Sequence, residues 1–230
     1  MEVNMTTWDH LLKQMLWQQL DFVQGLKILD FGSGAGETAA HLAACNDVTA
    51  VEPWEEQLAQ RTEGAYTQLR GGVELVRQMP DASFDMVLCH NVLEYVDEKE
   101  AYLRELARVV KRGGLMSIVK HNRPGRVMQM TVLLNDFAMA NTLLDGGNGT
   151  TSKFGDIRYY TDDELLGWLP DMALQSLWGA RTFWDLQQRQ ECHTDPDWQR
   201  QMLALEHRVS TVPEYQAIAF FHHLLLRKRG

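Results

Sequence analysis

Three glycines at alternate positions form the stretch of this sequence best suited to binding a ligand. They are Gly32, Gly34 and Gly36. A short apolar run that ends at Asp30 precedes them, and an alanine-rich segment, 37–45, follows. The apolar run predicts a buried strand and the alanines predict a helix. A strand that turns through glycines into a helix lets backbone N–H groups approach a ligand closely, as in sites for dinucleotides and for S-adenosylmethionine (SAM).

The spacing and charges of this loop favour SAM over a dinucleotide. A dinucleotide loop has the pattern G-x-G-x-x-G, whereas the third glycine here comes one residue earlier and Glu37 follows it. A carboxylate there would repel a pyrophosphate but not a sulfonium amino acid, and Asp30 suits the ammonium group of SAM. The predicted strand 48–51 ends at Glu52, whose carboxylate is placed to accept both ribose hydroxyls. The alternative is a tight turn without a ligand.

The composition predicts one globular domain, 1–230, with a substantial core. Hydrophobic residues make up 45% of the chain and charged residues 23%, which is typical of soluble proteins. No run approaches the roughly 20 apolar residues of a membrane span, and the N-terminus lacks the pattern of a signal peptide. The three cysteines are far apart and predict neither a disulfide framework nor a zinc site. We therefore expect a cytoplasmic protein.

The charge distribution bears on nucleic acid as a partner. A formal net charge of −9 argues against indiscriminate binding to nucleic acid. Basic residues nevertheless gather within 111–126 and at 227–229. They form either a local surface for a polyanion or ordinary solvated charges, and the sequence leaves both interpretations open.

Two motifs, D-F-G-S-G-A-G (30–36) and V-T-A-V-E-P (48–53), resemble the first two motifs of the class I SAM-dependent methyltransferases. The resemblance implies an α/β fold: a Rossmann-like, doubly wound sheet of seven strands with an antiparallel last strand. It also implies SAM as the cofactor and no metal. A helix is expected over 98–112. The further strands are expected at 73–76, 84–90, 115–120, 174–183 and 215–226, the last at the sheet edge beside its predecessor.

Two further segments are expected to frame the cofactor site. Residues 6–24 have an apolar face at helical spacing and predict an N-terminal helix. Residues 123–160 are too long for a tight connection and predict a helical insertion that forms a substrate lid. After it, Thr161 and Glu164 have the spacing of a capping box, which predicts the start of another helix.

The superfamily resemblance implies cofactor contacts at the loop and at the tips of neighbouring strands. Lys13 would reach the carboxylate of SAM and Trp54 would pack on its ribose or adenine, with an exposed lysine and a core tryptophan as alternatives. His90 would contact the methionine moiety or help desolvate the acceptor, or else be a structural histidine. The full predicted set is Lys13, Asp30, Gly32, Ser33, Gly34, Glu52, Pro53, Trp54, Gln78, Met79, His90 and Asn91.

A narrower resemblance concerns the acceptor. The segments L-K-Q-M-L-W-Q-Q-L-D (12–21), C-H-N-V-L-E-Y-V (89–96) and R-T-F-W-D-L (181–186), with the turn at Asn122, resemble the bacterial tRNA 5-carboxymethoxyuridine methyltransferases. That family esterifies a carboxylate on a tRNA wobble uridine. A carboxylate is ionised at neutral pH, so it needs a cation to position it rather than a base. The resemblance implies Arg181 and Arg123 as these cations, and Asn122 as a hydrogen-bond donor to the acceptor.

Three functions stay open from the sequence. The first is a carboxylate O-methyltransferase acting on tRNA, favoured if residues 120–126 and 227–229 share one face with the cofactor site. The second is a methyltransferase of a small-molecule or carrier-bound acid, favoured if the insertion closes the site completely. The third is a non-catalytic SAM-binding protein, favoured if side chains plug the acceptor space. A NAD-dependent oxidoreductase is disfavoured by the loop.

Overall fold

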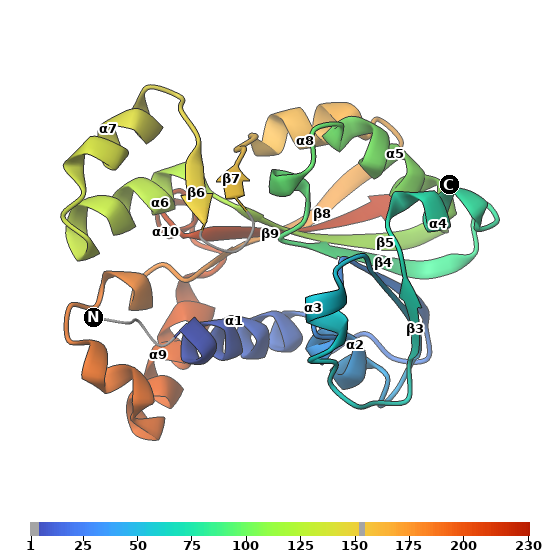
Figure 1. Ribbon diagram of the computed structural model, residues 1–230, viewed down its shortest axis with the longest axis horizontal. Coiled ribbons are helices and arrows are strands. Elements are labelled where there is room, and N and C mark those ends of the chain that lie inside the picture. The colour runs from blue at the N-terminus through green and yellow to red at the C-terminus, as the bar shows by residue number, and fades with distance from the viewer. Residues whose placement is uncertain (1–4, 152–154) are drawn as a thin grey trace. The chain divides into compact units, whose positions relative to one another are not determined.

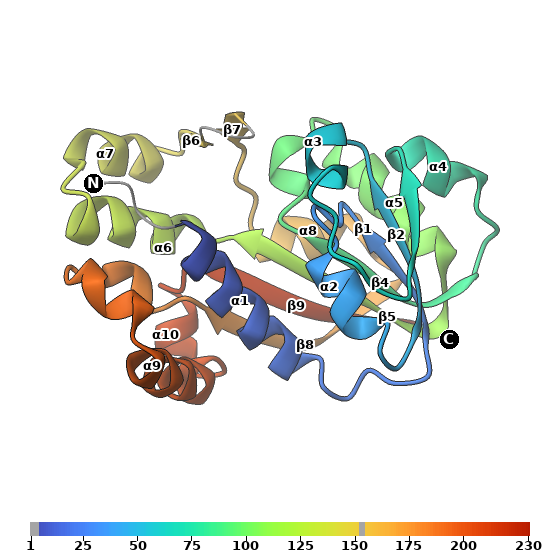
Figure 2. The same cartoon turned by 60° about the horizontal axis from the view of Figure 1, so that its bottom comes forward.

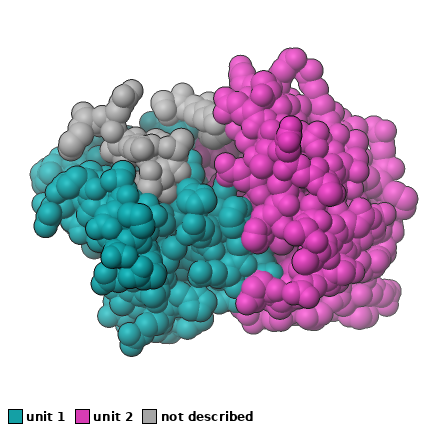
Figure 3. All heavy atoms as spheres, turned by 90° about the horizontal axis from the view of Figure 1, so that it is seen from below, with its two compact units in different colours: residues 1–20, 121–159, 177–223 teal, residues 21–120, 160–176, 224–230 magenta. Residues whose placement is uncertain are grey.

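The computed structural model describes residues 5–151 and 155–230, which divide into two compact units (Figure 3). Unit 1 comprises the described residues of 1–20, 121–159 and 177–223. Unit 2 comprises residues 21–120, 160–176 and 224–230. The predicted cofactor residues other than Lys13 lie in unit 2, and the predicted acceptor residues lie in unit 1.

A seven-stranded sheet carries the fold, in the order β3-β2-β1-β4-β5-β9-β8 (Figure 1). The five strands from β3 to β5 are parallel to their neighbours, and the last strand, β9, is antiparallel. This is the predicted Rossmann-like fold. The strands are β1 (Lys27–Phe31), β2 (Asp47–Glu52), β3 (Thr67–Arg70), β4 (Phe84–His90), β5 (Val110–His121), β8 (Met172–Ala180) and β9 (Phe221–Lys228).

The central strands form because their apolar runs are buried on both faces, as expected in a parallel sheet. Ile28 and Leu29 of β1 are fully buried, and so are Met86 and Leu88 of β4. Each such side chain stabilises the fold by about 1.5–3 kcal/mol relative to exposure. The predictions of a strand before the glycines, a strand ending at Glu52 and a strand over 84–90 are confirmed.

The prediction of a third strand at 73–76 is wrong. The strand that pairs with β2 is β3, before the Gly71-Gly72 turn, and Val73–Gln78 forms helix α4 instead. Val73 and Val76 are both buried. Their spacing of three residues is that of one helix face, whereas residues three apart point to opposite faces of a strand.

Two further predicted boundaries are corrected. The helix predicted over 98–112 is α5 (Lys99–Val109), and β5 begins at Val110, five residues before the predicted 115. The last strand lies between β5 and β8, and β8 forms the edge. Residues 221–226 of β9 are all buried, which suits an interior strand.

The helices of unit 2 cover both faces of its part of the sheet. Figure 1 shows α4, α5 and α8 on one face and α2 on the other. Helix α8 begins with the predicted capping box, because the Thr161 hydroxyl accepts the Glu164 N–H and the Glu164 carboxylate accepts the Thr161 N–H. These helices and turns are α2 (Glu37–Leu42), α3 (Glu55–Leu58), α4 (Val73–Gln78), η1 (Leu93–Tyr95), α5 (Lys99–Val109) and α8 (Asp162–Trp168).

Unit 1 contains the N-terminal helix and the insertion. Helix α1 (Met5–Gln19) ends five residues before the predicted 24, because residues 20–22 form a turn. The predicted insertion contains helices α6 (Arg123–Met128), η2 (Gln129–Leu133) and α7 (Phe137–Leu144), followed by a hairpin of β6 (Gly149–Thr151) and β7 (Gly155–Ile157). Helices α6 and α7 lie side by side (Figure 2), and a core of Met130, Ala140 and Leu143 holds the insertion together.

The remainder of unit 1 lies between β8 and β9. It consists of η3 (Trp184–Leu186), η4 (Gln190–Thr194), α9 (Pro196–Val209) and α10 (Pro213–Gln216). Across the described residues, we find no helix that combines the length and the apolar character needed to cross a membrane.

Candidate functional site

The glycine loop has the conformation that its sequence predicts. Gly32, Gly34 and Gly36 have φ values of +73°, +57° and +75°, which side-chain-bearing residues rarely adopt. A Cβ on Gly32 would lie 2.3 Å from Val92, whereas a Cβ on Gly34 would meet nothing closer than 3.8 Å. The backbone is therefore open at Gly34, where a ligand has room to approach.

Glu52 ties the loop to the end of β2. Its buried carboxylate accepts the Gly34 N–H at 2.8 Å through Oε2 and the Trp54 N–H at 2.9 Å through Oε1. A carboxylate has about four acceptor positions, so both oxygens retain capacity for ribose hydroxyls. Glu52 thus lies directly beside the open part of the loop. Ser33, next to Gly34, donates its N–H to the Val51 carbonyl at 3.1 Å.

The residues after Glu52 lie at the surface of unit 2. Pro53 is exposed, and Trp54 is 49% exposed at the N-terminus of α3. The core alternative for Trp54 is therefore wrong. An exposed indole adjacent to Glu52 suits the predicted packing against a ribose or adenine.

The ends of β1 and β4 place three predicted residues, Asp30, His90 and Asn91, next to the loop. Asp30 is buried one residue before the end of β1, opposite Leu88 of β4. At the end of β4, the His90 Nε2 is hydrogen bonded to the Ser117 hydroxyl at 2.8 Å. Burial lowers the pKa of His90 to about 3, so the imidazole is neutral at physiological pH. His90 can therefore exchange hydrogen bonds with a ligand but cannot supply a positive charge.

Asn91, directly after His90, has a φ of +55°. Its N–H donates to the Val119 carbonyl at 2.8 Å, which fixes the turn that leaves β4. Asparagine is among the few residues that tolerate this region, and such positions cluster at functional sites.

Gln78 and Met79 do not lie at a strand tip. They are at the C-terminal end of α4, where Gln78 is exposed and donates to the Glu74 carbonyl at 3.1 Å. The Met79 carbonyl accepts a hydrogen bond from Arg108 at 2.9 Å. The positional reason for predicting an adenine contact is therefore lost, and the tip of the third strand is formed by Arg70 and the following Gly71.

The predicted acceptor residues Asn122 and Arg123 begin helix α6 in unit 1. The Asn122 side-chain amide donates to the carbonyls of Ala219 at 2.8 Å and Ala217 at 3.1 Å. Arg123 is half-buried, with its guanidinium 5.3 Å from the Tyr159 ring centre and a hydrogen bond to the Gly146 carbonyl. In this structure Asn122 anchors the insertion to the segment before β9.

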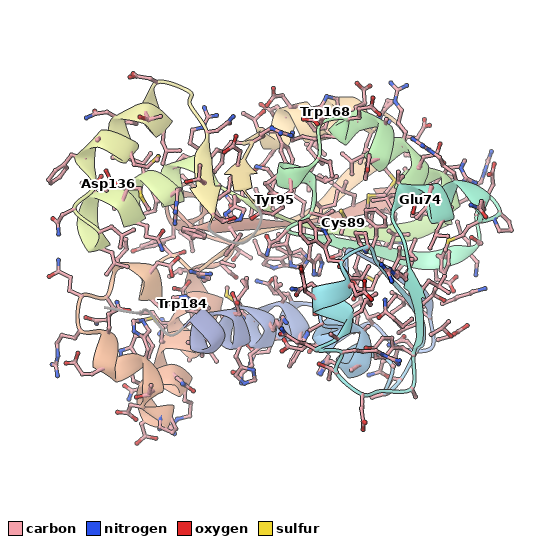
Figure 4. All side chains as sticks on the ribbon, viewed as in Figure 1. Glu74, Cys89, Tyr95, Asp136, Trp168 and Trp184 are labelled. Carbon is pink, nitrogen blue, oxygen red and sulfur yellow. The ribbon has the colours of Figure 1, made fainter. Side chains whose placement is uncertain are left out.

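Arg181 is buried and has a φ of +61°. Its guanidinium donates from Nε and Nη2 to Oδ1 of Asp185, at 3.1 and 2.6 Å. It also lies 4.6 Å from the ring centre of Phe220 and 5.8 Å from that of Trp184, which is labelled in Figure 4. Burial raises the pKa of Asp185, and Arg181 opposes that shift.

Two residues near Arg181, Arg126 and Asp185, were not predicted as site residues. Arg126 of α6 is hydrogen bonded to Gln129, and its guanidinium lies 5.7 Å from the same Phe220 ring. Asp185 stands four residues after Arg181 within the R-T-F-W-D-L segment. An acidic residue four positions after an arginine was the signal in the sequence that could have identified Asp185 as the partner of Arg181.

The predicted cofactor residue Lys13 is half-buried on α1, which belongs to unit 1.

Several of the basic residues noted in the sequence are engaged within unit 2. Lys120 is buried, with its Nζ 3.0 Å from Oδ1 of Asp162 and 4.9 Å from the Tyr160 ring centre. Arg227 donates to the Gly113 carbonyl at 2.6 Å. Lys228 donates to carbonyls at the C-terminal end of α5. These side chains make contacts within unit 2, and residues 227–228 belong to strand β9 rather than to a tail.

The residues present fit SAM as a cofactor: a glycine loop open at Gly34, a buried acceptor in Glu52, and Asp30 suited to an ammonium.

No group of three or more His, Cys, Asp or Glu side chains that could hold a metal ion occurs in the part of the chain that the structure describes. Methyl transfer from SAM is a displacement at a carbon already activated by the sulfonium. The protein mainly has to align donor and acceptor in a dry site.

Comparison with known proteins shows which kind of domain carries these residues. Residues 29–118 match the family described as "Methyltransferase domain". The chain is 27% identical to the tRNA 5-carboxymethoxyuridine methyltransferase of Escherichia coli (strain K12), over 97% of this chain and 90% of that protein. It is 33% identical to the ubiquinone biosynthesis O-methyltransferase of Maricaulis maris, over 50% of this chain and 48% of that protein.

Solved structures share the fold. A S-adenosylmethionine-dependent methyltransferase described as putative, from Listeria monocytogenes, has a TM-score of 0.66 and 14% identity, covering 96% of this chain and all of that one. The Burkholderia thailandensis 1,6-didemethyltoxoflavin-N1-methyltransferase, solved with S-adenosylhomocysteine, has a TM-score of 0.55 and 17% identity, over 95% and 76% of the two chains. The chain thus carries a methyltransferase domain over 29–118 and has the class I SAM-dependent methyltransferase fold, and SAM is its cofactor.

Proposed function

We propose that this methyltransferase O-methylates a carboxylate, that of 5-carboxymethoxyuridine at the wobble position of tRNA. The observation that carries the proposal is the similarity to the Escherichia coli enzyme along nearly the whole chain, including the acceptor segments of unit 1. A tRNA acceptor implies a cytoplasmic protein.

The chemistry of unit 1 supports a carboxylate acceptor. Arg126 and Arg181 approach the same Phe220 ring, and Arg123 lies over Tyr159. Guanidinium groups bind carboxylates through paired hydrogen bonds, and aromatic rings exclude water and stack on bases. The acceptor is ionised without help, so it needs no general base, and the neutral His90 is consistent with that.

The cofactor is proposed to bind on unit 2. Glu52 would accept the ribose hydroxyls, the loop backbone would face the methionine part, and the exposed Trp54 would cover the ribose or adenine. The insertion 123–160 is proposed to be the substrate lid of a single domain, 1–230. The proposed SAM contacts on unit 2 are Asp30, Gly32, Ser33, Gly34, Glu52, Pro53, Trp54, His90 and Asn91, and Gln78 and Met79 are no longer among them because they do not lie at a strand tip.

A small carboxylic acid is the second candidate acceptor. It is favoured by the buried ion pair of Lys120 with Asp162, which removes one of the basic residues that a surface for RNA would use. The similarity to ubiquinone biosynthesis O-methyltransferases, whose name indicates a small-molecule pathway, also favours a small-molecule acceptor.

The deciding experiment transfers label from methyl-labelled SAM to bulk tRNA from cells that lack this gene. The tRNA proposal expects labelled tRNA whose label is released by mild alkali, because a methyl ester hydrolyses there whereas a methylated base or ribose does not. Bulk tRNA from cells that retain the gene is the matched substrate control and should accept little label, because its acceptor is already methylated.

The Glu52→Ala variant is the matched enzyme control and should transfer no label. Unlabelled tRNA would refute the tRNA proposal, provided that the acceptor nucleoside is detected in the preparation and the protein binds SAM. Label that resists alkali would refute the ester. Unlabelled tRNA would be followed by a screen of small carboxylic acids with the same label, whereas alkali-resistant label would direct the search to another group of the tRNA.

A further inference from the structure

The third glycine of the loop, Gly36, faces the hydroxyl of Tyr66. A Cβ on Gly36 would lie 2.2 Å from the Tyr66 Oη and 2.9 Å from its Cζ. The φ of +75° independently disfavours a side chain. In dinucleotide loops the third glycine allows a helix to pack closely on a strand. Here the early third glycine leaves room for a tyrosine from outside the loop.

The Tyr66 side chain is buried and fixed by two hydrogen bonds. Its hydroxyl donates to the Thr62 carbonyl at 2.7 Å and accepts from the Arg61 Nε at 3.0 Å. The Arg61 guanidinium also lies 4.5 Å from the ring centre. The hydroxyl that meets Gly36 is therefore held in one position.

The same segment binds the loop a second time. The Thr62 N–H donates to the carbonyl of Ala35 at 2.7 Å. Residues 61–66 thus contact two successive loop residues, one through a backbone hydrogen bond and one through the tyrosine hydroxyl. They support the loop at Ala35 and Gly36, while Gly34 stays open toward the proposed ligand.

We propose that Tyr66, with Arg61 and Thr62, is a brace that holds the glycine loop in its cofactor-binding conformation. Tyr66 is a positioning residue, because it acts through Gly36 and needs no contact with SAM. A loop that is already ordered loses less conformational entropy when its backbone binds the cofactor, which raises affinity. The inference rests on SAM as the cofactor and is independent of the acceptor.

The first test measures SAM and S-adenosylhomocysteine binding to Tyr66→Phe by calorimetry. Removing the hydroxyl deletes two hydrogen bonds and should raise both dissociation constants about 3- to 10-fold. Amide hydrogen exchange at 33–37 should become faster in the free protein. Arg61→Gln removes one of the same bonds from an exposed position and should give a smaller change in the same direction.

The second test measures coupling between Tyr66 and Gly36. Gly36→Ala should weaken SAM binding more in the wild-type background than in Tyr66→Phe, because the atom at 2.2 Å is then absent. Gly25→Ala is the matched control. Gly25 has a φ of +69°, but a Cβ added there would meet nothing within 4 Å, so this variant carries the backbone strain without the collision. Its SAM affinity should equal that of the wild type.

Two results would overturn the brace. One is Tyr66→Phe with a lower melting temperature but unchanged affinity for both ligands, which would make Tyr66 a residue of the fold only. The other is an equal effect of Gly36→Ala in both backgrounds, which would mean that the hydroxyl does not constrain the loop.

Discussion

The guanidinium of Arg181 donates two hydrogen bonds to one carboxylate oxygen of Asp185, and both side chains are buried. Asp185 is therefore a counterion for Arg181 within the protein, whereas Arg181 was predicted to hold a substrate carboxylate. Because Asp185 already balances Arg181, the proposed binding of the acceptor carboxylate relies also on Arg126, which approaches the same Phe220 ring, and on Arg123. Arg181 then has two proposed roles: it orders the side chains around it, and it binds the acceptor.

Replacing Glu52 should remove cofactor binding. Glu52→Ala deletes the charged acceptor of the Gly34 and Trp54 N–H groups together with the proposed ribose contacts. The loss of two or more charge-assisted hydrogen bonds predicts a SAM dissociation constant at least about 100-fold higher. Calorimetry checks this. Glu55→Ala, an exposed carboxylate three residues later, is the control and should bind normally. Normal affinity in Glu52→Ala would refute the placement of the ribose.

Replacing Arg181 should separate the acceptor from the cofactor. Arg181→Lys keeps the positive charge but loses the planar fork, so SAM affinity should stay within about two-fold while acceptor turnover falls by about 30-fold. Turnover is measured by label transfer to the acceptor, and the circular dichroism spectrum checks the fold. Full turnover would contradict a role of Arg181 in positioning the acceptor.

Removing Asp185 should destabilise the fold. Asp185→Ala leaves the Arg181 charge buried without this carboxylate, which typically lowers the free energy of unfolding by about 3–5 kcal/mol. Urea denaturation measures the change. Asp197→Ala, which removes the exposed partner of Arg200, is the control and should cost less than about 1 kcal/mol. Equal effects of the two variants would show that the buried pair contributes no more than a surface pair.

Stability should depend on pH through His90. Its pKa is lowered from 6.5 to about 3 in the folded protein, so the unfolded chain binds the extra proton across that interval. The stabilisation is fully present above pH 6.5 and is lost as pH falls toward 3. In urea denaturation as a function of pH, His90→Gln should have a shallower loss of stability in this window. His207→Gln, an exposed histidine, should follow the wild type. A His90→Gln curve parallel to that of the wild type would contradict the shift.

Lys120 and Asp162 flank the insertion on its two sides and form an ion pair within unit 2. Asp162→Ala would leave the buried Lys120 ammonium without this carboxylate and should lower the free energy of unfolding by about 3 kcal/mol or more. Asp163→Ala is the control, because Asp163 is exposed in the same first turn of α8 and shares its helix-end electrostatics. A similar loss in both variants would assign the effect to the helix end instead.

The features that the sequence determined by itself are local ones. Gly32, Gly34 and Gly36 adopt positive φ values because only glycine does so at low cost, and that requirement is visible in the residue types. Strand β4 follows from the apolar run 86–89, and the capping box involves Thr161 and Glu164, three residues apart. The position of Glu52 at the end of β2 follows from the short apolar run that precedes it.

The tertiary structure decided what depends on distant partners. Strand β9 lies between β5 and β8 because strand order depends on hydrogen bonds between segments far apart in the sequence. The Asn122 amide bonds Ala217 and Ala219, and Gly36 makes room for Tyr66. Spacing along the chain cannot specify such contacts, because they form only where folding brings remote backbone and side chains within hydrogen-bonding distance.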